Sequence, residues 1–230
     1  MISVVIPTLN EEKYLEPTLK ALRNQTYNKK FEIIVVDYNS KDRTKQIAEK
    51  YADKVITTKK KGIAAGRNAG AKIAKGNIYT FIDADTIVLP NVLNEIDKLF
   101  QKRNDLTVAS VVTLPMSSSL SNIMSYWFIN SVQKNSSKYG RPMMPGFCLS
   151  CRKKAFHKIN GFDEKLKAGE EVDLSMRLSK LGNADVLETT VAFTSTRRSD
   201  KNGHMKSMYQ WFKGLFMGKI FGDGSYESVR

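Results

Sequence analysis

The sequence predicts an α/β fold with a mainly parallel central sheet flanked by helices. In the N-terminal part of the chain, short apolar runs alternate with amphipathic stretches, and polar residues follow each apolar run. Such alternation is typical of βαβ units, and strands that are apolar at consecutive positions are covered on both faces. A chain of 230 residues is long enough to bury the core that this fold requires.

Strands and helices are predicted in turn along the first part of the chain. The predicted strands cover residues 3–7, 32–37 and 78–82. The predicted helices, in which apolar side chains recur at helical spacing, cover residues 14–24, 44–51 and 64–75. Each strand therefore ends where polar residues begin.

The second part of the chain is less regular. We expect a strand over 107–114, a partly exposed helix over 123–132, and a loop over 141–150 that leads into another strand. Two further helices are predicted over 153–158 and 170–181, the second ending at Gly182 as at a typical C-cap.

The chain is strongly basic, with a formal net charge of +14 and a sequence pI of about 9.7. This charge attracts phosphates, nucleic acid or anionic lipid without selecting among them. The composition excludes a disordered or collagen-like chain. No apolar run reaches the roughly 18 residues of a membrane span, and the N-terminus is unlike a signal peptide. The expected location is therefore the cytoplasm, including the cytoplasmic face of a membrane.

The two cysteines, Cys148 and Cys151, are too few for a disulfide scaffold. With two histidines in the whole chain, they also make a poor zinc site. We expect both thiols to be structural.

Polar clusters follow the three predicted strands of the first part, over 8–11, 37–40 and 83–85. In open α/β sheets, ligands bind outside the carboxyl ends of the strands. Asp83 and Asp85 lie two apart, so their carboxylates project to the same side of an extended backbone. Such hard oxygen ligands suit Mg²⁺ or Mn²⁺ bound alongside a substrate diphosphate, although an Asp-x-Asp also commonly just ends a strand.

Several motifs in order over residues 1–195 resemble those of the family-2 glycosyltransferases, which have the GT-A fold of a nucleotide-diphospho-sugar transferase. The motifs are Val4-Val5-Ile6-Pro7-Thr8-Leu9-Asn10-Glu11, Phe31 to Asp37 with Asn39, Ser40 and Asp42, Gly66-Arg67-Asn68-Ala69-Gly70, Asp83-Ala84-Asp85, Gly161-Phe162-Asp163-Glu164, and Gly169 to Leu174 with Arg177. The resemblance implies a nucleotide-sugar-binding half over 1–105 and an acceptor-side half over 106–195.

The resemblance also implies a donor site for a nucleoside-diphosphate sugar. Asp83 would lie by the ribose and Asp85 would hold a divalent cation, Mn²⁺ or Mg²⁺, on the diphosphate. The implied nucleotide-sugar contacts are Pro7, Leu9, Glu11, Asp37, Arg67, Asp83, Ala84, Asp85, Arg197 and Arg198. The implied metal set is Asp85, Asp83 and His204. For His204 alone, a solvated surface histidine is the favoured interpretation. Leu9 and Tyr38 differ from the residues that the family commonly has at these positions of the nucleotide site. The resemblance therefore does not identify the base or the sugar of the donor.

On the acceptor side, the resemblance implies an inverting reaction with one general base. Glu171 matches the base by its offset from Arg177, although the family usually has Asp there, and Glu170 is the second candidate. Because a nucleoside diphosphate leaves without a proton, one carboxylate on the acceptor side is sufficient. The alternative is that Glu170, Glu171 and Asp173 only stabilise the N-terminal end of a helix.

The acceptor is expected to be a hydroxyl on a glycan or lipid-linked glycan. The alternative is a polyprenyl (dolichyl) phosphate, as in enzymes similar to dolichyl-phosphate mannose synthase, where no base is needed. Residues 196–230 are basic and aromatic, and read either as a helix packed on the domain or as one lying on an anionic membrane. A nucleic-acid-binding protein would explain the charge but not the acidic strand ends, so no nucleic-acid partner is expected. The oligomeric state stays open.

Overall fold

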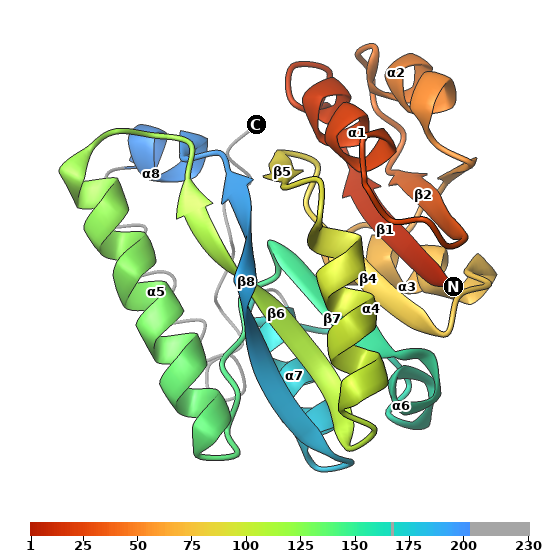
Figure 1. The fold of residues 1–230 in the computed structure, drawn as a ribbon. Coiled ribbons are helices and arrows are strands. Elements are labelled where there is room, and N and C mark those ends of the chain that lie inside the picture. The colour runs from red at the N-terminus through yellow and green to blue at the C-terminus, as the bar shows by residue number, and fades with distance from the viewer. Residues whose placement is uncertain (167, 203–230) are drawn as a thin grey trace.

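The computed structural model of the chain describes residues 1–166 and 168–202, which contain one eight-stranded sheet (Figure 1). The strand order is β3-β2-β1-β4-β7-β6-β8-β5. The strands are β1 (Ile2–Thr8), β2 (Phe31–Asp37), β3 (Lys54–Thr57), β4 (Ile78–Ile82), β5 (Thr86–Val88), β6 (Leu106–Pro115), β7 (Cys148–Arg152) and β8 (Asn183–Thr194). Only β7 and β5 pair antiparallel with their neighbours among these strands. The predicted α/β class with a mainly parallel sheet is confirmed.

Helices cover both faces of the sheet. They are α1 (Leu15–Arg23), α2 (Thr44–Tyr51), α3 (Ile63–Ile73), α4 (Val92–Lys102), α5 (Leu120–Lys138), α6 (Lys153–Lys158), α7 (Glu170–Ser179) and α8 (Arg197–Asn202). Val4 of β1 belongs to a core cluster shared with α1, α2 and α4, whereas Val5 belongs to a second cluster shared with α3, α6 and α7. None of these helices is long and apolar enough to cross a membrane.

The predicted element bounds agree with the structure wherever the hydrophobic pattern is strong. The predictions over 44–51, 78–82 and 153–158 coincide with α2, β4 and α6, and most others differ by one or two residues at an end. The helix predicted over 123–132 was too short, because α5 spans Leu120–Lys138. Serine and asparagine residues at both ends of α5 hide its length in the sequence, and packing on β6 and β8 supports it in the fold.

Four elements were not predicted, namely β3, β5, α4 and β8. The strands β3 and β5 have four and three residues, too few for a clear pattern. By contrast, α4 buries Val92, Leu93, Ile96 and Phe100, a helical repeat that the sequence does show. β8 contains a register shift against β6, which interrupts its alternation.

The sheet is continuous across residue 105, the expected boundary between the two halves. After β4, the chain forms β5, which pairs with β8 at the far edge of the sheet, and α4 also packs against β8. The 86–102 segment thus lies on strands of the second half. The assignment of donor and acceptor binding to separate halves stays a prediction.

Both cysteines lie on β7 and are buried free thiols. Burial raises the pKa of the Cys148 thiol to about 12, and burial likewise raises that of Cys151. Neutral, buried thiols in a central strand match the structural role expected from the sequence.

Small residues bring α3 into close contact with β1. A Cβ atom on Gly66 would lie 3.1 Å from the Cβ atom of Pro7, and one on Gly70 would lie 3.0 Å from Val36 Cγ2 and closer still to Val5. The α3 backbone therefore packs directly on the strands. This contact places Arg67, between the two glycines, beneath the carboxyl ends of the strands.

We predict that Gly70→Ala lowers the free energy of unfolding by about 1–3 kcal/mol, because the added methyl group would overlap Val5. Chemical unfolding of the variant measures the change. Lys72→Ala on the exposed side of α3 is the control and should change stability by less than about 0.5 kcal/mol. Equal stability of Gly70→Ala and the unaltered chain would contradict the tight packing of α3.

Candidate active site

The candidate site lies at the carboxyl ends of β1, β2 and β4. Thr8 and Asp37 are paired at the ends of β1 and β2, and Asp83 directly follows β4. These strands are parallel neighbours, so the polar clusters that follow them converge at one edge of the sheet. The convergence expected from the sequence is therefore present in the structure.

The guanidinium group of Arg67 lies at the centre of this site and is completely buried. Its Nη1 atom donates to Glu171 Oε1 at 2.6 Å, and its Nη2 atom donates to Asp83 Oδ1 at 2.8 Å. Glu170 Oε1 lies 3.6 Å from Nη1. The Phe162 ring packs against the guanidinium, 5.3 Å from its Cζ atom. Arg67 thus joins the Asp-x-Asp motif to the acidic start of α7.

The acidic groups around Arg67 change one another's ionisation. Burial by itself would lower the pKa of Arg67, but Glu171, Asp83 and Glu170 together raise it above its ordinary value. Burial and the neighbouring Glu171 raise the pKa of Glu170 to about 7. The cluster therefore contains a permanent cation and a carboxyl that can hold a proton near neutral pH.

Gly146, in the loop before β7, leaves the space that the Arg67 and Glu171 side chains occupy. A Cβ atom there would lie 2.7 Å from Arg67 Nη2 and would overlap Glu171 Oε1. Gly146 was not among the residues predicted for the site. The Pro145-Gly146 pair indicates a turn, but only the fold shows that this turn faces Glu171.

A second arginine, Arg197 at the start of α8, lies on the side of the site that is predicted to bind the donor. It donates two hydrogen bonds to the Glu11 carboxylate, at 2.6 and 2.7 Å, and its Nε atom lies 3.0 Å from Asp85 Oδ2. Its guanidinium also stacks on the Tyr14 ring, 4.5 Å from the centroid. The C-terminal end of the described chain is thereby held against the loops that follow β1 and β4.

Asp85 is surrounded by acidic side chains, so a nearby positive charge would stabilise its carboxylate. Burial, Asp83 and Glu11 raise its pKa to about 7, whereas Arg197 acts in the opposite direction. The described residues contain no group of three or more histidine, cysteine or acidic side chains placed to hold a metal by themselves. A divalent cation that takes one or two carboxylates and completes its shell with substrate phosphates fits this arrangement.

The loops after β1 and β2 are held together by short polar contacts. The backbone amide of Asn10 donates to Ser40 Oγ, and that of Lys41 donates to Asn10 Oδ1, both at 2.9 Å. Asn10 has a φ of 54°, in the left-handed region that asparagine tolerates. Ser40 also donates through its backbone amide to Asp37 Oδ2 at 2.9 Å. Asp37 is thus a buried organiser of these loops, and its contact with the nucleotide stays a prediction.

The remaining predicted donor residues lie around the same loops. Pro7 and Leu9 are half-buried at the end of β1, next to Gly66 and Asn10 respectively. Ala84 is buried, and its carbonyl accepts a hydrogen bond from Thr18 at 2.9 Å. The Arg198 side chain and all of His204 lie outside the described part of the chain.

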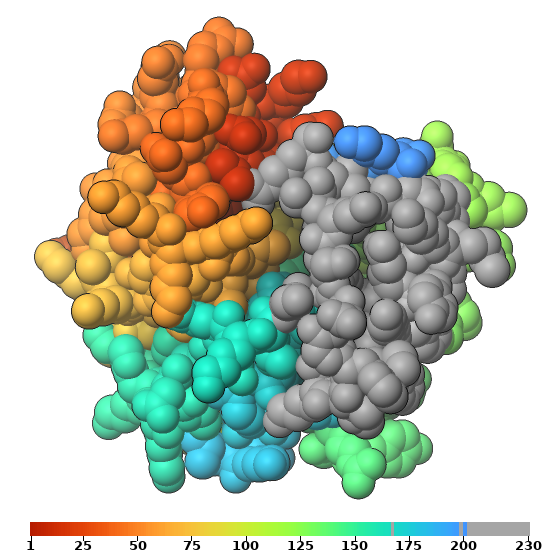
Figure 2. All heavy atoms as spheres, turned by 180° about the vertical axis from the view of Figure 1, so that it is seen from behind, coloured from red at the N-terminus to blue at the C-terminus, as the bar shows by residue number. Residues whose placement is uncertain are grey.

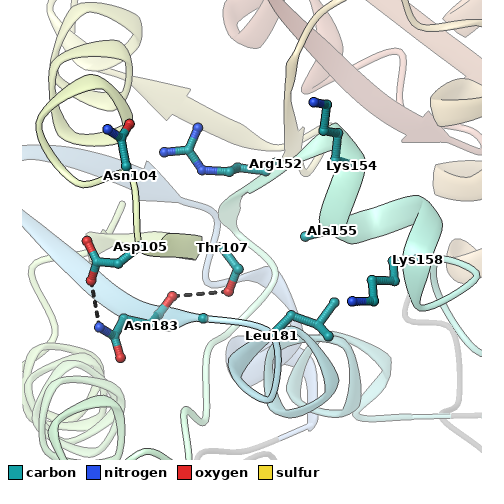
Figure 3. A pocket seen from close by; sticks show the side chains of 10 residues that line it. Asn104, Asp105, Thr107, Arg152, Lys154, Ala155, Lys158, Leu181 and Asn183 are labelled. Atoms are coloured by element: carbon teal, nitrogen blue, oxygen red, sulfur yellow. Dashed lines mark hydrogen bonds between the residues drawn. The ribbon is translucent and has the colours of Figure 1, made fainter.

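A separate cavity of about 450 Å³ lies at the opposite end of the sheet, where β6 and β8 begin (Figure 3). Arg152 lines it but donates to the carbonyls of Leu106, Phe100 and Arg103. Asp105 accepts from Asn183 at 2.6 Å. None of the residues predicted for the donor or acceptor lines this cavity, and these polar contacts serve the fold.

Comparison with known proteins identifies related sequences. Residues 3–159 match the family model described as "Glycosyl transferase family 2". A dolichol-phosphate mannosyltransferase of Pyrococcus furiosus is 34% identical over 114 residues, covering 47% of this chain and 32% of that protein. An uncharacterized glycosyltransferase of Rickettsia typhi is 28% identical over 193 residues, covering 80% of this chain and 60% of that protein. The chain thus spans less than two thirds of the length of these relatives.

Solved structures share the fold. The structure of Staphylococcus aureus TarS 1–349 in complex with UDP-GlcNAc superposes with a TM-score of 0.72 and 23% identity, covering 85% of this chain and 58% of TarS. The mannosyltransferase PcManGT of Pyrobaculum calidifontis, in complex with GDP-Man and Mn²⁺, gives a TM-score of 0.76 and 19% identity, covering 94% and 62%. At these identities, the likeness establishes a common fold.

We predict that Glu170→Gln flattens the pH dependence of stability between about pH 4.5 and 7. A carboxyl whose pKa is raised in the folded chain holds its proton more tightly there than in the unfolded chain. The free energy of unfolding therefore falls as the pH rises through this range, by an amount on the order of a few kcal/mol. Glutamine cannot titrate, so urea unfolding at a series of pH values should show a smaller fall.

The control for this prediction is Glu95→Gln on α4. Hydrogen bonds from Lys98 and Thr189 lower the pKa of Glu95, so its contribution to stability is lost only as the pH falls below its ordinary range. Parallel stability curves for Glu170→Gln and the unaltered chain above pH 4.5 would show that Glu170 does not titrate there.

Proposed function

The chain belongs to glycosyl transferase family 2 and has the GT-A fold, and from this premise we propose that it transfers a sugar from a nucleoside diphosphate to a hydroxyl acceptor with inversion. The observation that carries the proposal is the position of Arg67. One buried guanidinium contacts both Asp83 of the Asp-x-Asp motif and Glu171 of α7. The proposed donor-side and acceptor-side carboxylates are therefore bridged by one arginine side chain.

On the donor side, the proposed substrate is a nucleoside-diphosphate sugar. The two structural neighbours are complexes with UDP-GlcNAc and GDP-Man, which share a nucleoside diphosphate linked to a sugar. The loops that carry Glu11 and Asp37 would bind the nucleoside. Arg197 would offer its guanidinium to the diphosphate, because two of its present partners, Glu11 and Asp85, belong to the proposed donor site.

Asp85 is the residue proposed to hold a divalent cation, Mn²⁺ or Mg²⁺, with Asp83 beside it. When bound, the cation supplies positive charge to the departing diphosphate. Asp83 accepts from the fully buried Arg67, whereas the partner of Asp85 is Arg197, which is partly exposed and lies on a short helix. Asp85 can therefore exchange its partner for a cation more readily than Asp83 can. PcManGT was solved with Mn²⁺, which supports a cation in this fold.

On the acceptor side, Glu171 is proposed as the general base. Arg67 fixes its Oε1 atom at 2.6 Å, and Oε2 has no partner among the described residues. Oε2 would take the proton of the acceptor hydroxyl while that oxygen forms a bond to the anomeric carbon and the bond to the diphosphate breaks on the opposite face. Glu170 is less exposed, with 10% of its side chain accessible against 18% for Glu171, and remains the second candidate.

A polyprenyl phosphate is the second candidate acceptor, because one relative is a dolichol-phosphate mannosyltransferase. An ionised phosphate attacks without losing a proton, so this reaction would not need Glu171 as a base. Either lipid-linked acceptor would bring the chain to the cytoplasmic face of a membrane. The basic 196–230 segment was expected to contribute to that contact, and its residues beyond 202 lie outside the described structure.

We predict that Glu171→Gln lowers the rate of transfer to a hydroxyl acceptor by about 10²–10⁴-fold, because the amide that replaces the proposed base cannot take the proton. Donor binding should persist, as measured by the shift in melting temperature with a sugar nucleotide and Mn²⁺. Glu95→Gln is the control and should retain activity. If Glu171→Gln keeps full turnover on the hydroxyl acceptor, Glu171 is not the base. If Glu171→Gln keeps full turnover on a polyprenyl phosphate but not on the hydroxyl acceptor, that result would favour the second acceptor.

We predict that Asp85→Asn loses the Mn²⁺-dependent binding of UDP and GDP. The amide keeps the shape of the side chain but removes the charge that a hard cation requires. A thermal-shift screen with each nucleotide, with and without Mn²⁺, measures the effect. Asp105→Asn, at the opposite end of the sheet, removes one negative charge without touching the site, and it should respond like the unaltered chain. A retained Mn²⁺ effect in Asp85→Asn would place the cation elsewhere.

A further inference from the structure

Helix α5 is packed with its polar side inward and its apolar side outward. Its buried side chains are Asn122, Tyr126 and Gln133, two of which are amides. Its large exposed side chains are Leu120 at 71% exposure, Ile123 at 47%, Met124 at 61% and Trp127 at 70%. A surface helix of a globular protein normally shows the reverse arrangement. Contiguous exposed apolar side chains of this size mark a surface that contacts something else.

The polar inner side of α5 is fixed by specific hydrogen bonds. Asn130 accepts from the backbone amide of Thr113 at 3.1 Å and donates to the carbonyl of Thr113 at 2.8 Å. Gln133 donates to Asn130 Oδ1 at 2.8 Å. Asn122 donates to Ser117 Oγ at 3.0 Å and to Asp200 Oδ1 at 3.2 Å. Rotating α5 to bury its apolar side would break these bonds, so the outward apolar side belongs to the fold.

The outer side of α5 changes from apolar to basic along its length. In steps of four and three residues, which keep to one side of a helix, it carries Leu120, Met124, Trp127, Ser131, Lys134 and Lys138. Residues 106–133 contain no charged side chain. Lys134 pairs with Glu188 at 2.7 Å, and Lys138 is exposed. Leu114 and Met116, just before α5, are also exposed, at 39% and 40%.

We propose that this outer side of α5 docks on an anionic lipid bilayer. Leucine, isoleucine and methionine would enter the boundary of the acyl chains, tryptophan favours the interface, and the two lysines would lie among anionic headgroups. Charge complementarity selects this partner, because Lys138 is exposed, the outer side of α5 itself has no acidic residue and the whole chain carries +14. Lys134 would exchange its exposed ion pair with Glu188 for an anionic headgroup. The membrane contact considered in the sequence analysis involves residues 196–230. The outer side of α5 is a separate contact surface.

The docking surface lies close to the candidate active site. Asp200 of α8 accepts from Asn122 near the N-terminal end of α5, and Arg197 at the start of the same short helix contacts Asp85. Figure 1 shows α8 beside this end of α5, and α5 reaches the outer edge of the molecule in the rear view (Figure 2). An acceptor carried in the bilayer would thus be presented near the site. That consequence rests on the proposed function, whereas the docking does not.

The test uses the full chain and vesicles of phosphatidylglycerol and phosphatidylcholine in equal parts, with phosphatidylcholine alone for comparison. We expect co-flotation with the anionic vesicles. Met124→Ser with Trp127→Ser should weaken it about tenfold or more, because two apolar side chains no longer leave water. Leu181→Ser, which changes an exposed leucine outside α5, at the cavity where β8 begins, is the matched control and should float like the unaltered chain. Lys134→Gln with Lys138→Gln should weaken flotation only on anionic vesicles.

Tryptophan fluorescence distinguishes α5 from the C-terminal segment, because the chain has two tryptophans, Trp127 and Trp211. In Trp211→Phe, the emission of Trp127 should shift to the blue when anionic vesicles are added. No shift there, together with a shift in Trp127→Phe, would overturn the proposal and assign the contact to the segment around Trp211. The proposal would also be overturned if the chain does not bind vesicles and the serine substitutions change its oligomeric state. That result would favour a protein partner.

These outcomes are separate from those of the proposed function. The serine variants leave the candidate active site intact, so their transfer to a water-soluble acceptor should equal that of the unaltered chain. Their melting temperatures should also be unchanged, because the substituted side chains are exposed. Failure to float with normal soluble-acceptor activity would disprove docking alone, and absent activity with normal flotation would disprove the function alone.

Discussion

The buried ion pairs of Arg67 constrain the rest of the site. A fully buried guanidinium is tolerated because three carboxylates surround it, and those carboxylates are in turn tolerated because of the guanidinium. Removing either side of such a group leaves an uncompensated buried charge, which typically costs about 3–5 kcal/mol. The close packing of α3 on β1 and the absence of a side chain at Gly146 are the steric conditions for this arrangement. The fold and the candidate chemistry therefore depend on the same contacts.

Two arginines divide the acidic groups between them. Arg67 takes Asp83 and the two glutamates at the start of α7, whereas Arg197 takes Glu11 and Asp85. Acidic side chains alone would repel a diphosphate, so this neutralisation is what makes an acidic strand edge compatible with such a ligand. The two arginines differ in their exposure. Arg67 is inaccessible, whereas Arg197 is partly exposed and lies on a short helix near the end of the described chain, so it can exchange partners at less cost.

The sequence allowed the first part of the fold to be predicted because its strands are apolar on both faces and its polar clusters follow them directly. The same patterns identified Asp83 and Asp85 as candidates, whereas Glu171 was identified through the resemblance to family-2 glycosyltransferases. These patterns did not reveal that Arg67 joins Asp83 to Glu171, because Arg67 on α3 and Glu171 on α7 are 104 positions apart and meet only in the folded chain. Gly146 and the pairing of Arg197 with Glu11 were missed for the same reason. Long-range contacts of this kind have no periodic signal in a single sequence.

Helix α5 shows why an apolar pattern alone does not determine which side of a helix is buried. Its apolar residues recur at helical spacing, and that spacing would normally be interpreted as the side that faces the core. The core side is decided instead by amides that match the backbone of β6 at Thr113 and a carboxylate of α8 at Asp200. Because α8 also begins with Arg197, one short helix contributes both to the orientation of α5 and to the ion pair with Asp85. A displacement of α8 would therefore change contacts both at α5, which carries the apolar surface, and at Asp85, on the acidic edge of the sheet.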